Sequence, residues 1–170
     1  MPLTLADVDR IAAAAHAGQV DKTGVPYIGH PRAVAAGLAP FGVGMQMAGL
    51  LHDVLEDTAV TGPELRRLGV PGAVVELVEL VTSRPQVAYP DMIELIALNY
   101  GAALVKVADN AHNSRPDRTG RLPEEQRARL GKKYAGARAV LWRALPGEDV
   151  ATVLRVVNPW LLPELEAFPT

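Results

Sequence analysis

Apolar residues recur at the three- and four-residue spacing of an α-helix along almost the whole chain. No stretch combines strict alternation of apolar and polar residues with a two-residue turn of the Asn-Gly type, which would mark paired strands. The run ALVKVA at 103–108 resembles a strand, but it continues without a breaker through Asp109 to Asn113, which favours a helix. We therefore predict an all-α protein.

Chain length limits the number of domains. The 170 residues are 49% hydrophobic, and a chain of this size buries roughly 70% of the surface that its unfolded form exposes. That buried surface is enough for one hydrophobic core, whereas the chain is short for two full domains. We expect a single domain over 1–170, with a motif-bearing core at about 8–145 and further helices at 146–170.

Capping and breaking residues set the expected helix boundaries. Thr4 can cap a first helix that ends near Gly18, and the Gly- and Pro-rich stretch 19–31 is expected as a loop. Thr61 and Glu64 have the spacing of a capping box. Further helices are expected after Pro31, over about 44–58, after Thr61, from Pro71, over about 91–98, over about 102–113 and over about 123–145.

Composition excludes several classes of function. The absence of cysteine rules out disulfides, thiolate metal sites and a cysteine nucleophile. The net charge of −2 and an aromatic content of 5% argue against nucleic acid as a partner. The first residues lack a basic signal region and no long uncharged apolar run occurs, so we expect a cytoplasmic protein without a membrane partner. The sequence carries no signal for an oligomeric state.

The segment LLHDVLEDT concentrates ionisable side chains on one helical face. On a helical wheel, His52, Asp53, Glu56 and Asp57 share an arc that contains no Lys or Arg, and leucine and valine fill the other face. Like charges at helical spacing cost about 0.2–0.5 kcal/mol per pair, a penalty that a bound cation would reverse. The plainer alternative is a solvated helix face.

Imidazole nitrogen and carboxylate oxygen together suit a divalent ion such as Mn, Fe, Co or Zn. The adjacent His52 and Asp53 cannot complete such a site alone. Further donors could come from His30, His112, His16 or other aspartates, and composition and spacing do not choose among them. His16 lies in an alanine run, which favours a packed core residue.

Four motifs resemble those of a known enzyme family. AAAAHAGQ, KTGVPYIGHP, HDVLEDT and VKVADNAHN occur in the order and at separations similar to those of the HD metal-dependent phosphohydrolases. The resemblance is greatest to the (p)ppGpp hydrolase domain of RelA/SpoT proteins and to free-standing small alarmone hydrolases. It extends from about Val8 to Leu145 and implies a single HD-domain helical bundle.

The resemblance also implies a metal site and site residues. Two neutral histidines and two aspartates would bring a 2+ ion near zero net charge and leave positions for water and phosphate. A Glu-Asp pair one turn further would orient or deprotonate the water, and basic and polar groups would bind the nucleotide. The implied residues are His30, His52, Asp53 and Asp109 for one Mn²⁺ per chain, Glu56 and Asp57 for catalysis, and Lys22, Tyr27, Asn113 and Arg115 for substrate.

Some positions depart from the family pattern or stay open. Asp21 stands where many of these hydrolases have a second basic residue, which puts the base preference or affinity for (p)ppGpp in question. Arg127 and Tyr134, on the late helix, are possible equivalents of a basic and an aromatic residue of the nucleotide pocket. We assign His112 to structure.

These observations favour a metal-dependent hydrolase that releases pyrophosphate from the 3′ position of (p)ppGpp-like alarmones and leaves GDP or GTP. A second hypothesis keeps the metal but changes the substrate to a nucleoside monophosphate or an NADPH-like dinucleotide phosphate. A third is a catalytically silent domain that binds a nucleotide. Alarmone synthesis is not expected, because 170 residues leave no room for a synthetase domain.

Overall fold

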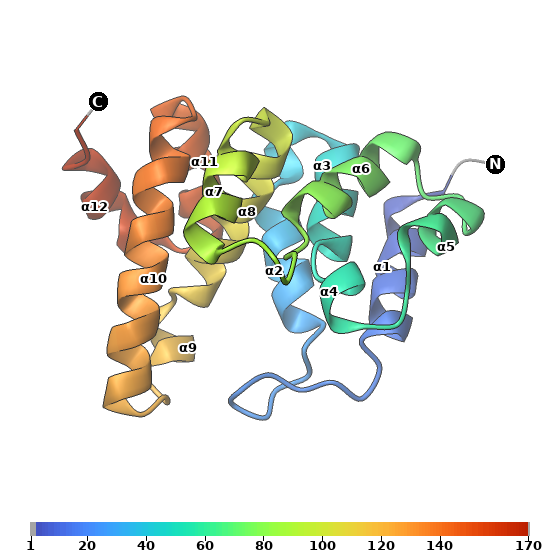
Figure 1. Cartoon of the computed structure of the whole chain (residues 1–170), viewed down its shortest axis with the longest axis horizontal. Coiled ribbons are helices and arrows are strands. Elements are labelled where there is room, and N and C mark those ends of the chain that lie inside the picture. The colour runs from blue at the N-terminus through green and yellow to red at the C-terminus, as the bar shows by residue number, and fades with distance from the viewer. Residues whose placement is uncertain (1–2, 170) are drawn as a thin grey trace.

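The computed structural model describes residues 3–169, and its regular elements in that range are helices (Figure 1), so the predicted all-α fold is confirmed. One isolated antiparallel bridge, between Val20 and Pro26, closes the loop that follows the first helix. In the described part of the chain, every helix is too short or too polar to cross a membrane.

The helices follow one another with mostly short connections, apart from the long loop over 16–28. The first six are α1 (Leu5–Ala15), α2 (Gly29–Gly37), α3 (Val43–Leu51), α4 (Val54–Asp57), α5 (Gly62–Arg67) and α6 (Gly72–Val81). The remaining ones are α7 (Tyr89–Ala97), α8 (Tyr100–Asn113), α9 (Pro116–Thr119), α10 (Glu124–Arg143), α11 (Gly147–Val157) and α12 (Leu162–Glu166). Short 3-10 turns at Ala39–Phe41 and Pro159–Leu161 link α2 to α3 and α11 to α12.

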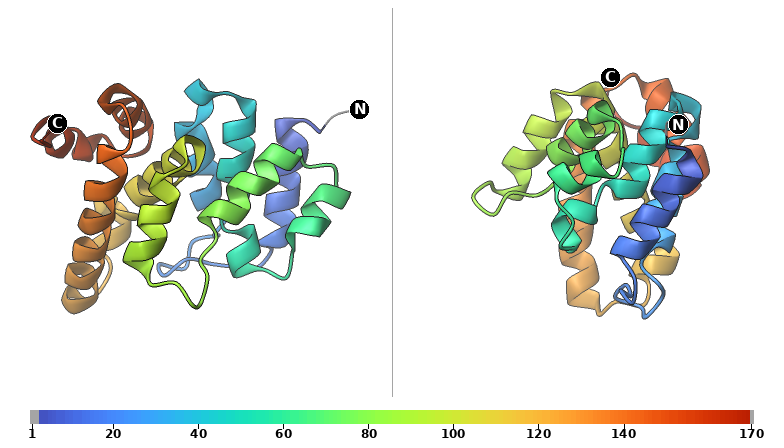
Figure 2. Two further views of the ribbon diagram at one scale, coloured as in Figure 1. Left: turned by 45° about the horizontal axis from the view of Figure 1, so that its top comes forward. Right: turned by 90° about the vertical axis from the view of Figure 1, so that its right-hand side faces the viewer.

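Helix α8 is the centre of the packing. It contacts α2, α3, α6, α7, α10 and α11, and nearly all of its residues from Ala102 to His112 are buried. In Figures 1 and 2, α10 and α12 stand at one end of the molecule and α1 and α5 at the other. The polar residues of α8 therefore face neighbouring helices, which positions them for a buried site.

The capping predictions are confirmed. Thr4 caps α1 in a reciprocal capping box with Asp7, and the backbone N–H of Thr61 donates to Glu64 Oε2 at 2.7 Å at the start of α5. The run ALVKVA lies within α8, as predicted. Helix α2 starts at Gly29, before the expected boundary at Pro31, because a proline is tolerated in the first helical turn. His30 therefore lies on a helix.

The expected continuous helix over 44–58 is wrong. Helix α3 ends at Leu51 and α4 begins at Val54. In an unbroken α-helix the Gly49 carbonyl would accept the N–H of Asp53, but here His52 Nδ1 donates to that oxygen at 2.8 Å. His52 and Asp53 keep right-handed helical backbone angles at this break, and their side chains face the same centre, with His52 Nε2 2.9 Å from Asp53 Oδ2.

A close contact between α2 and α3 fixes the separation of these two helices. A Cβ atom added at Gly49 would lie 2.9 Å from Ala35 Cα and 2.9 Å from Leu38 Cδ1. The neighbouring atom at Ala35 is backbone, which cannot rotate away. Glycine at 49 is thus required for α2 and α3 to pack at this distance.

We predict that Gly49→Ala destabilises the protein by about 1–3 kcal/mol relative to Gly44→Ala, a change on the same helix where an added Cβ would be 4.0 Å from its nearest neighbour. Both variants gain the same helix propensity, of about 1 kcal/mol, so their difference isolates the steric effect. Urea denaturation measures it. Equal free energies of unfolding for the two variants would contradict a tight α2–α3 contact.

Candidate metal centre and active site

Two histidines and an aspartate from distant parts of the sequence converge inside the helical bundle. His30 Nε2 lies 3.2 Å from His52 Nε2 and 3.2 Å from Asp109 Oδ1, and His52 Nε2 lies 3.8 Å from Asp109 Oδ1. All three residues are buried. Donor atoms that each sit about 2.1 Å from one ion can be at most about 4.2 Å apart, so this cluster fits a shared divalent cation.

Asp53 faces the same centre. Its Oδ2 lies 2.9 Å from His52 Nε2 and 3.4 Å from His30 Nε2, and it accepts a hydrogen bond from the Tyr27 hydroxyl at 2.5 Å. The four predicted ligands, from α2, the α3–α4 break and α8, are therefore neighbours. His16, the remaining N-terminal histidine, is buried, with its Nδ1 on Gln19 and its ring against Tyr27.

Hydrogen bonds at the far side of each ring orient the two imidazoles. His52 Nδ1 donates to the Gly49 carbonyl, which leaves the Nε2 lone pair of the neutral ring free to face the centre. His30 Nδ1 lies 2.7 Å from His112 Nδ1. Burial and the nearby positive groups of His30 and Arg118 lower the pKa of His112 to about 3. A neutral His112 can accept a hydrogen bond from His30 Nδ1. His112, which we assign to structure, therefore orients His30, one of the predicted metal ligands.

Carboxylates dominate the charge of the cluster. Burial disfavours a charged imidazole, but Asp53 and Asp109 outweigh it and raise the pKa of His52 to about 10. Burial likewise opposes ionisation of Asp109, yet Lys106, with its Nζ 2.8 Å from Asp109 Oδ2, keeps the pKa of that carboxyl well below its usual value. The site thus favours positive charge, and a divalent ion would take the place of the histidine proton.

Helix α8 supplies further polar groups next to Asp109. Asn113 Nδ2 donates to Asp109 Oδ1 at 2.5 Å, because residues four apart lie on the same face of a helix. Lys106 was not singled out from the sequence, although its i, i+3 spacing from Asp109 could have indicated the ion pair.

Glu56 and Asp57 lie on α4, beside the cluster. Glu56 Oε2 accepts the backbone N–H of Ser83 at 3.0 Å, which ties α4 to the segment that follows α6. Partial burial, together with the charges of Asp53 and Glu56, raises the pKa of Asp57. Both side chains line the same small cavity as Asp53 and Asp109.

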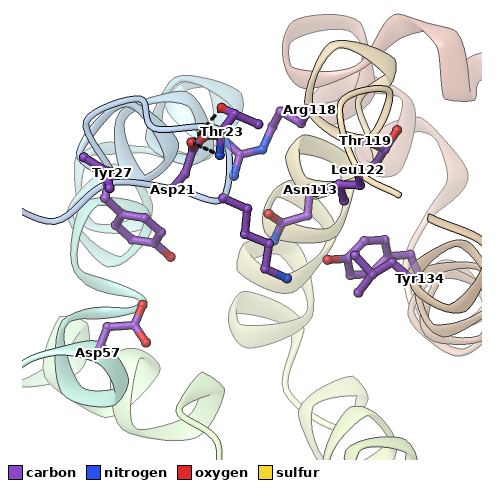
Figure 3. Close-up of a pocket in the computed structure, with 12 residues that line it drawn as sticks. Asp21, Thr23, Tyr27, Asp57, Asn113, Arg118, Thr119, Leu122 and Tyr134 are labelled. Carbon is purple, nitrogen blue, oxygen red and sulfur yellow. Dashed lines mark hydrogen bonds and ion pairs between the residues drawn. The ribbon is translucent and has the colours of Figure 1, made fainter. Parts of the chain in front are cut away.

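Two adjoining cavities open over these residues. One, of about 350 Å³, lies between the loop after α1, α9 and α10 (Figure 3). Tyr27 and Asp57 lie on one side of it and Asn113 and Tyr134 on the other. The second cavity, of about 170 Å³, is lined by Asp53 and Asp109 of the donor cluster. The two cavities share Tyr27, Asp57, Asn113 and Tyr134.

Most of the predicted substrate residues line the larger cavity. Lys22, Tyr27 and Asn113 do so, but Arg115 does not. Its guanidinium pairs with Asp117 at 2.9 Å and donates to the Val157 carbonyl at 3.3 Å. Helix α9, which the sequence analysis did not anticipate, brings Arg118 to the cavity instead.

Asp21 has a structural role in the loop after α1. Its Oδ1 accepts the backbone N–H groups of Thr23 at 2.8 Å and Val25 at 3.1 Å, and its Oδ2 lies 3.3 Å from Arg118 Nη1. Figure 3 shows this pair at the edge of the cavity. Tyr134 lines both cavities, whereas Arg127 lines a separate small one.

Comparison with known proteins places the chain in a family. The HD-domain family model matches residues 10–94, half of the chain, and the chain belongs to this family. Among curated proteins it is 36% identical to the bifunctional (p)ppGpp synthase/hydrolase SpoT of Escherichia coli K12 over 136 residues, 72% of this chain and 19% of SpoT. It is also 36% identical to a GTP pyrophosphokinase of Streptomyces coelicolor over 141 residues, 74% of this chain and 16% of that protein.

The chain spans about a fifth or less of the length of these bacterial relatives. A solved structure of similar size is also related. It belongs to a metazoan ortholog of SpoT that hydrolyses ppGpp, and it matches with a TM-score of 0.70 and 25% identity over 89% of this chain and 93% of that one. The HD-domain fold and the relationship to SpoT-type hydrolase domains are therefore established.

We predict that His52→Ala abolishes stoichiometric binding of Mn²⁺ and that His112→Ala weakens it by about 10–100-fold, because His112 orients the His30 ring. Isothermal titration with Mn²⁺ measures both effects. Circular dichroism provides the control for folding. Wild-type affinity in a folded His112→Ala protein would contradict the orienting role.

Proposed function

We propose that this HD domain hydrolyses the 3′-diphosphate of (p)ppGpp-like nucleotides and releases pyrophosphate and GDP or GTP. The observation that carries the proposal is the position of a buried metal-donor cluster beside two carboxylates and at the base of a cavity with basic walls. The relatedness to SpoT and to a metazoan protein that hydrolyses ppGpp supports this choice of substrate.

The metal proposal extends the three-residue cluster to four ligands, His30, His52, Asp53 and Asp109. Two nitrogens and two carboxylate oxygens suit a first-row divalent ion, and we propose Mn²⁺, one per chain. Such an ion, when bound, lowers the pKa of water and polarises a phosphoryl oxygen. The protein's contribution is to hold the donors in place through Gly49, His112, Lys106 and Asn113.

Glu56 and Asp57 have the geometry to handle the proton of the attacking water. The raised pKa of Asp57 brings this carboxylate closer to the range in which a general base is effective. Water attacks the phosphorus bonded to the 3′ oxygen, and the bond between that phosphorus and the 3′ oxygen breaks. The oxygen takes up a proton to become the ribose hydroxyl, and the diphosphate leaves with the oxygen of the water.

The larger cavity is suited to the nucleoside and its 5′ phosphates. Lys22 and Arg118 provide positive charge, Leu122 and Leu130 provide apolar contact, and Tyr134 offers an aromatic ring. The reacting 3′ group would then extend into the smaller cavity, past the four side chains that line both cavities. We propose that the whole chain works in this way as one cytoplasmic catalytic domain with a small-molecule nucleotide as partner.

Another nucleotide is the second candidate substrate. Asp21 lies at the cavity with its carboxylate directed to its own loop and to Arg118, and Arg115 is turned away. The basic groups available to a guanine base therefore differ from those implied by the family resemblance. A nucleoside monophosphate or an NADPH-like dinucleotide phosphate fits the same metal chemistry.

We expect the purified protein with Mn²⁺ to release pyrophosphate from ppGpp. Parallel incubations with NADPH and nucleoside monophosphates, followed by product identification, separate the candidates. Inorganic phosphate from these compounds, with no turnover of ppGpp, would favour the second candidate. Nucleotide binding without turnover of any of them would indicate a silent domain and contradict the proposed hydrolysis.

Glu56→Ala and Asp57→Asn are each expected to lower kcat for ppGpp by about 10²–10⁴-fold, because the water loses its proton acceptor. Affinity for Mn²⁺ should change little, since neither residue belongs to the proposed ligand set. Glu76→Ala, an exposed change on α6, is the matched control. Turnover that both site variants retain in full would exclude this pair from the reaction.

A further inference from the structure

The smaller cavity has a cationic wall that does not belong to the larger one. Lys106 of α8 and Lys133 of α10 line the smaller cavity, together with Tyr89 at the start of α7. None of these three residues lines the larger cavity, where Lys22 lies. The two lysines therefore belong to the part of the smaller cavity that the larger cavity does not share.

The two lysines hold their positions in different ways. The Lys106 side chain is only 12% exposed, and its ammonium bonds to Asp109. That bond uses one of the three N–H donors of the ammonium. Lys133 is exposed at the rim, and its Nζ lies 4.0 Å from the centre of the Tyr89 ring. A cation over an aromatic face is attracted to it, so Tyr89 steadies the Lys133 side chain beside the cavity.

Lys133 is placed by an aromatic ring and not by an ion pair in the described part of the chain. Among residues 3–169, no carboxylate oxygen is found within ion-pair distance of its ammonium, which instead rests on Tyr89. Partial burial, followed by the charge of Lys106, lowers the pKa of Lys133, and both ammonium groups line the same cavity. An anion between them would relieve that repulsion and accept hydrogen bonds from both.

We propose that Lys106 and Lys133 bind the terminal phosphate of a diphosphate whose inner phosphate is at the metal cluster. This inference rests on the proposed function and deepens it. It assigns to the lysine pair the preference for a diphosphate over a monophosphate at the reacting position. A monophosphate bound at the cluster, where Lys106 already bonds to Asp109, lacks the second phosphate that would reach Lys133.

The test is binding of inorganic pyrophosphate and of inorganic phosphate to the Mn²⁺-loaded protein, measured by isothermal titration. Wild-type protein is expected to bind pyrophosphate at least about tenfold more tightly than phosphate. Lys133→Met should lose about tenfold in affinity for pyrophosphate and little for phosphate, and Lys133→Arg should restore most of the loss. Lys106→Met should lose pyrophosphate affinity as well, with circular dichroism to verify the fold.

Lys132→Met is the matched control, because Lys132 is the adjacent exposed lysine on α10 and does not line the smaller cavity. Unchanged pyrophosphate affinity in Lys133→Met, or an equal loss in Lys132→Met, would overturn the assignment. Because the titration does not depend on turnover, it separates this inference from the proposed function. If the protein does not hydrolyse ppGpp, the proposed function is wrong, but binding of pyrophosphate can still be measured.

Where ppGpp is turned over, a second measurement applies. Lys133→Met should reduce the ratio of kcat/KM for ppGpp to kcat/KM for guanosine 5′-diphosphate 3′-monophosphate by about tenfold. A general loss of stability or of metal would lower both values together. An unchanged ratio would contradict a role of Lys133 in binding the terminal phosphate.

Discussion

The contact between α2 and α3 at Gly49 is the constraint on which the site depends. It sets how near His30 can come to His52, since the two residues lie on α2 and just beyond α3. The same residue supplies the carbonyl that orients the His52 ring and is thereby withdrawn from the regular helical ladder. One small residue thus serves both the close packing of two helices and the orientation of the His52 ring.

Around that contact, the buried charges balance one another through specific partners. Asp109 lies between Lys106 and the imidazoles, and Asp53 accepts the Tyr27 hydroxyl. Burial alone would drive these carboxyls to their neutral forms, but the surrounding donors keep them ionised. A buried group of acidic and imidazole side chains held by such partners is an environment that a divalent cation would stabilise.

Local signals in the sequence predicted most of the helices, because capping residues, prolines and apolar periodicity act within a few positions. The motif resemblance brought His30, His52, Asp53 and Asp109 together correctly as neighbours. Other features depend on tertiary contacts that no local pattern encodes. At the break after Leu51, His52 bonds to the Gly49 carbonyl. Arg115 is held away from the cavity by Asp117 and Val157, and Lys106 and Lys133 line one cavity because α8 and α10 pack together.

The residues of the site divide along the chain. The proposed metal donors and the paired carboxylates all fall between residues 30 and 109, whereas Lys22, Arg118 and Tyr134 reach the larger cavity from outside that span. Changes in the loop after α1 or in α9 and α10 would therefore alter the cavity that we propose for the nucleoside and leave the proposed hydrolytic residues in place. Divergence among paralogues of such a scaffold would be expected to alter selectivity first and reaction type last.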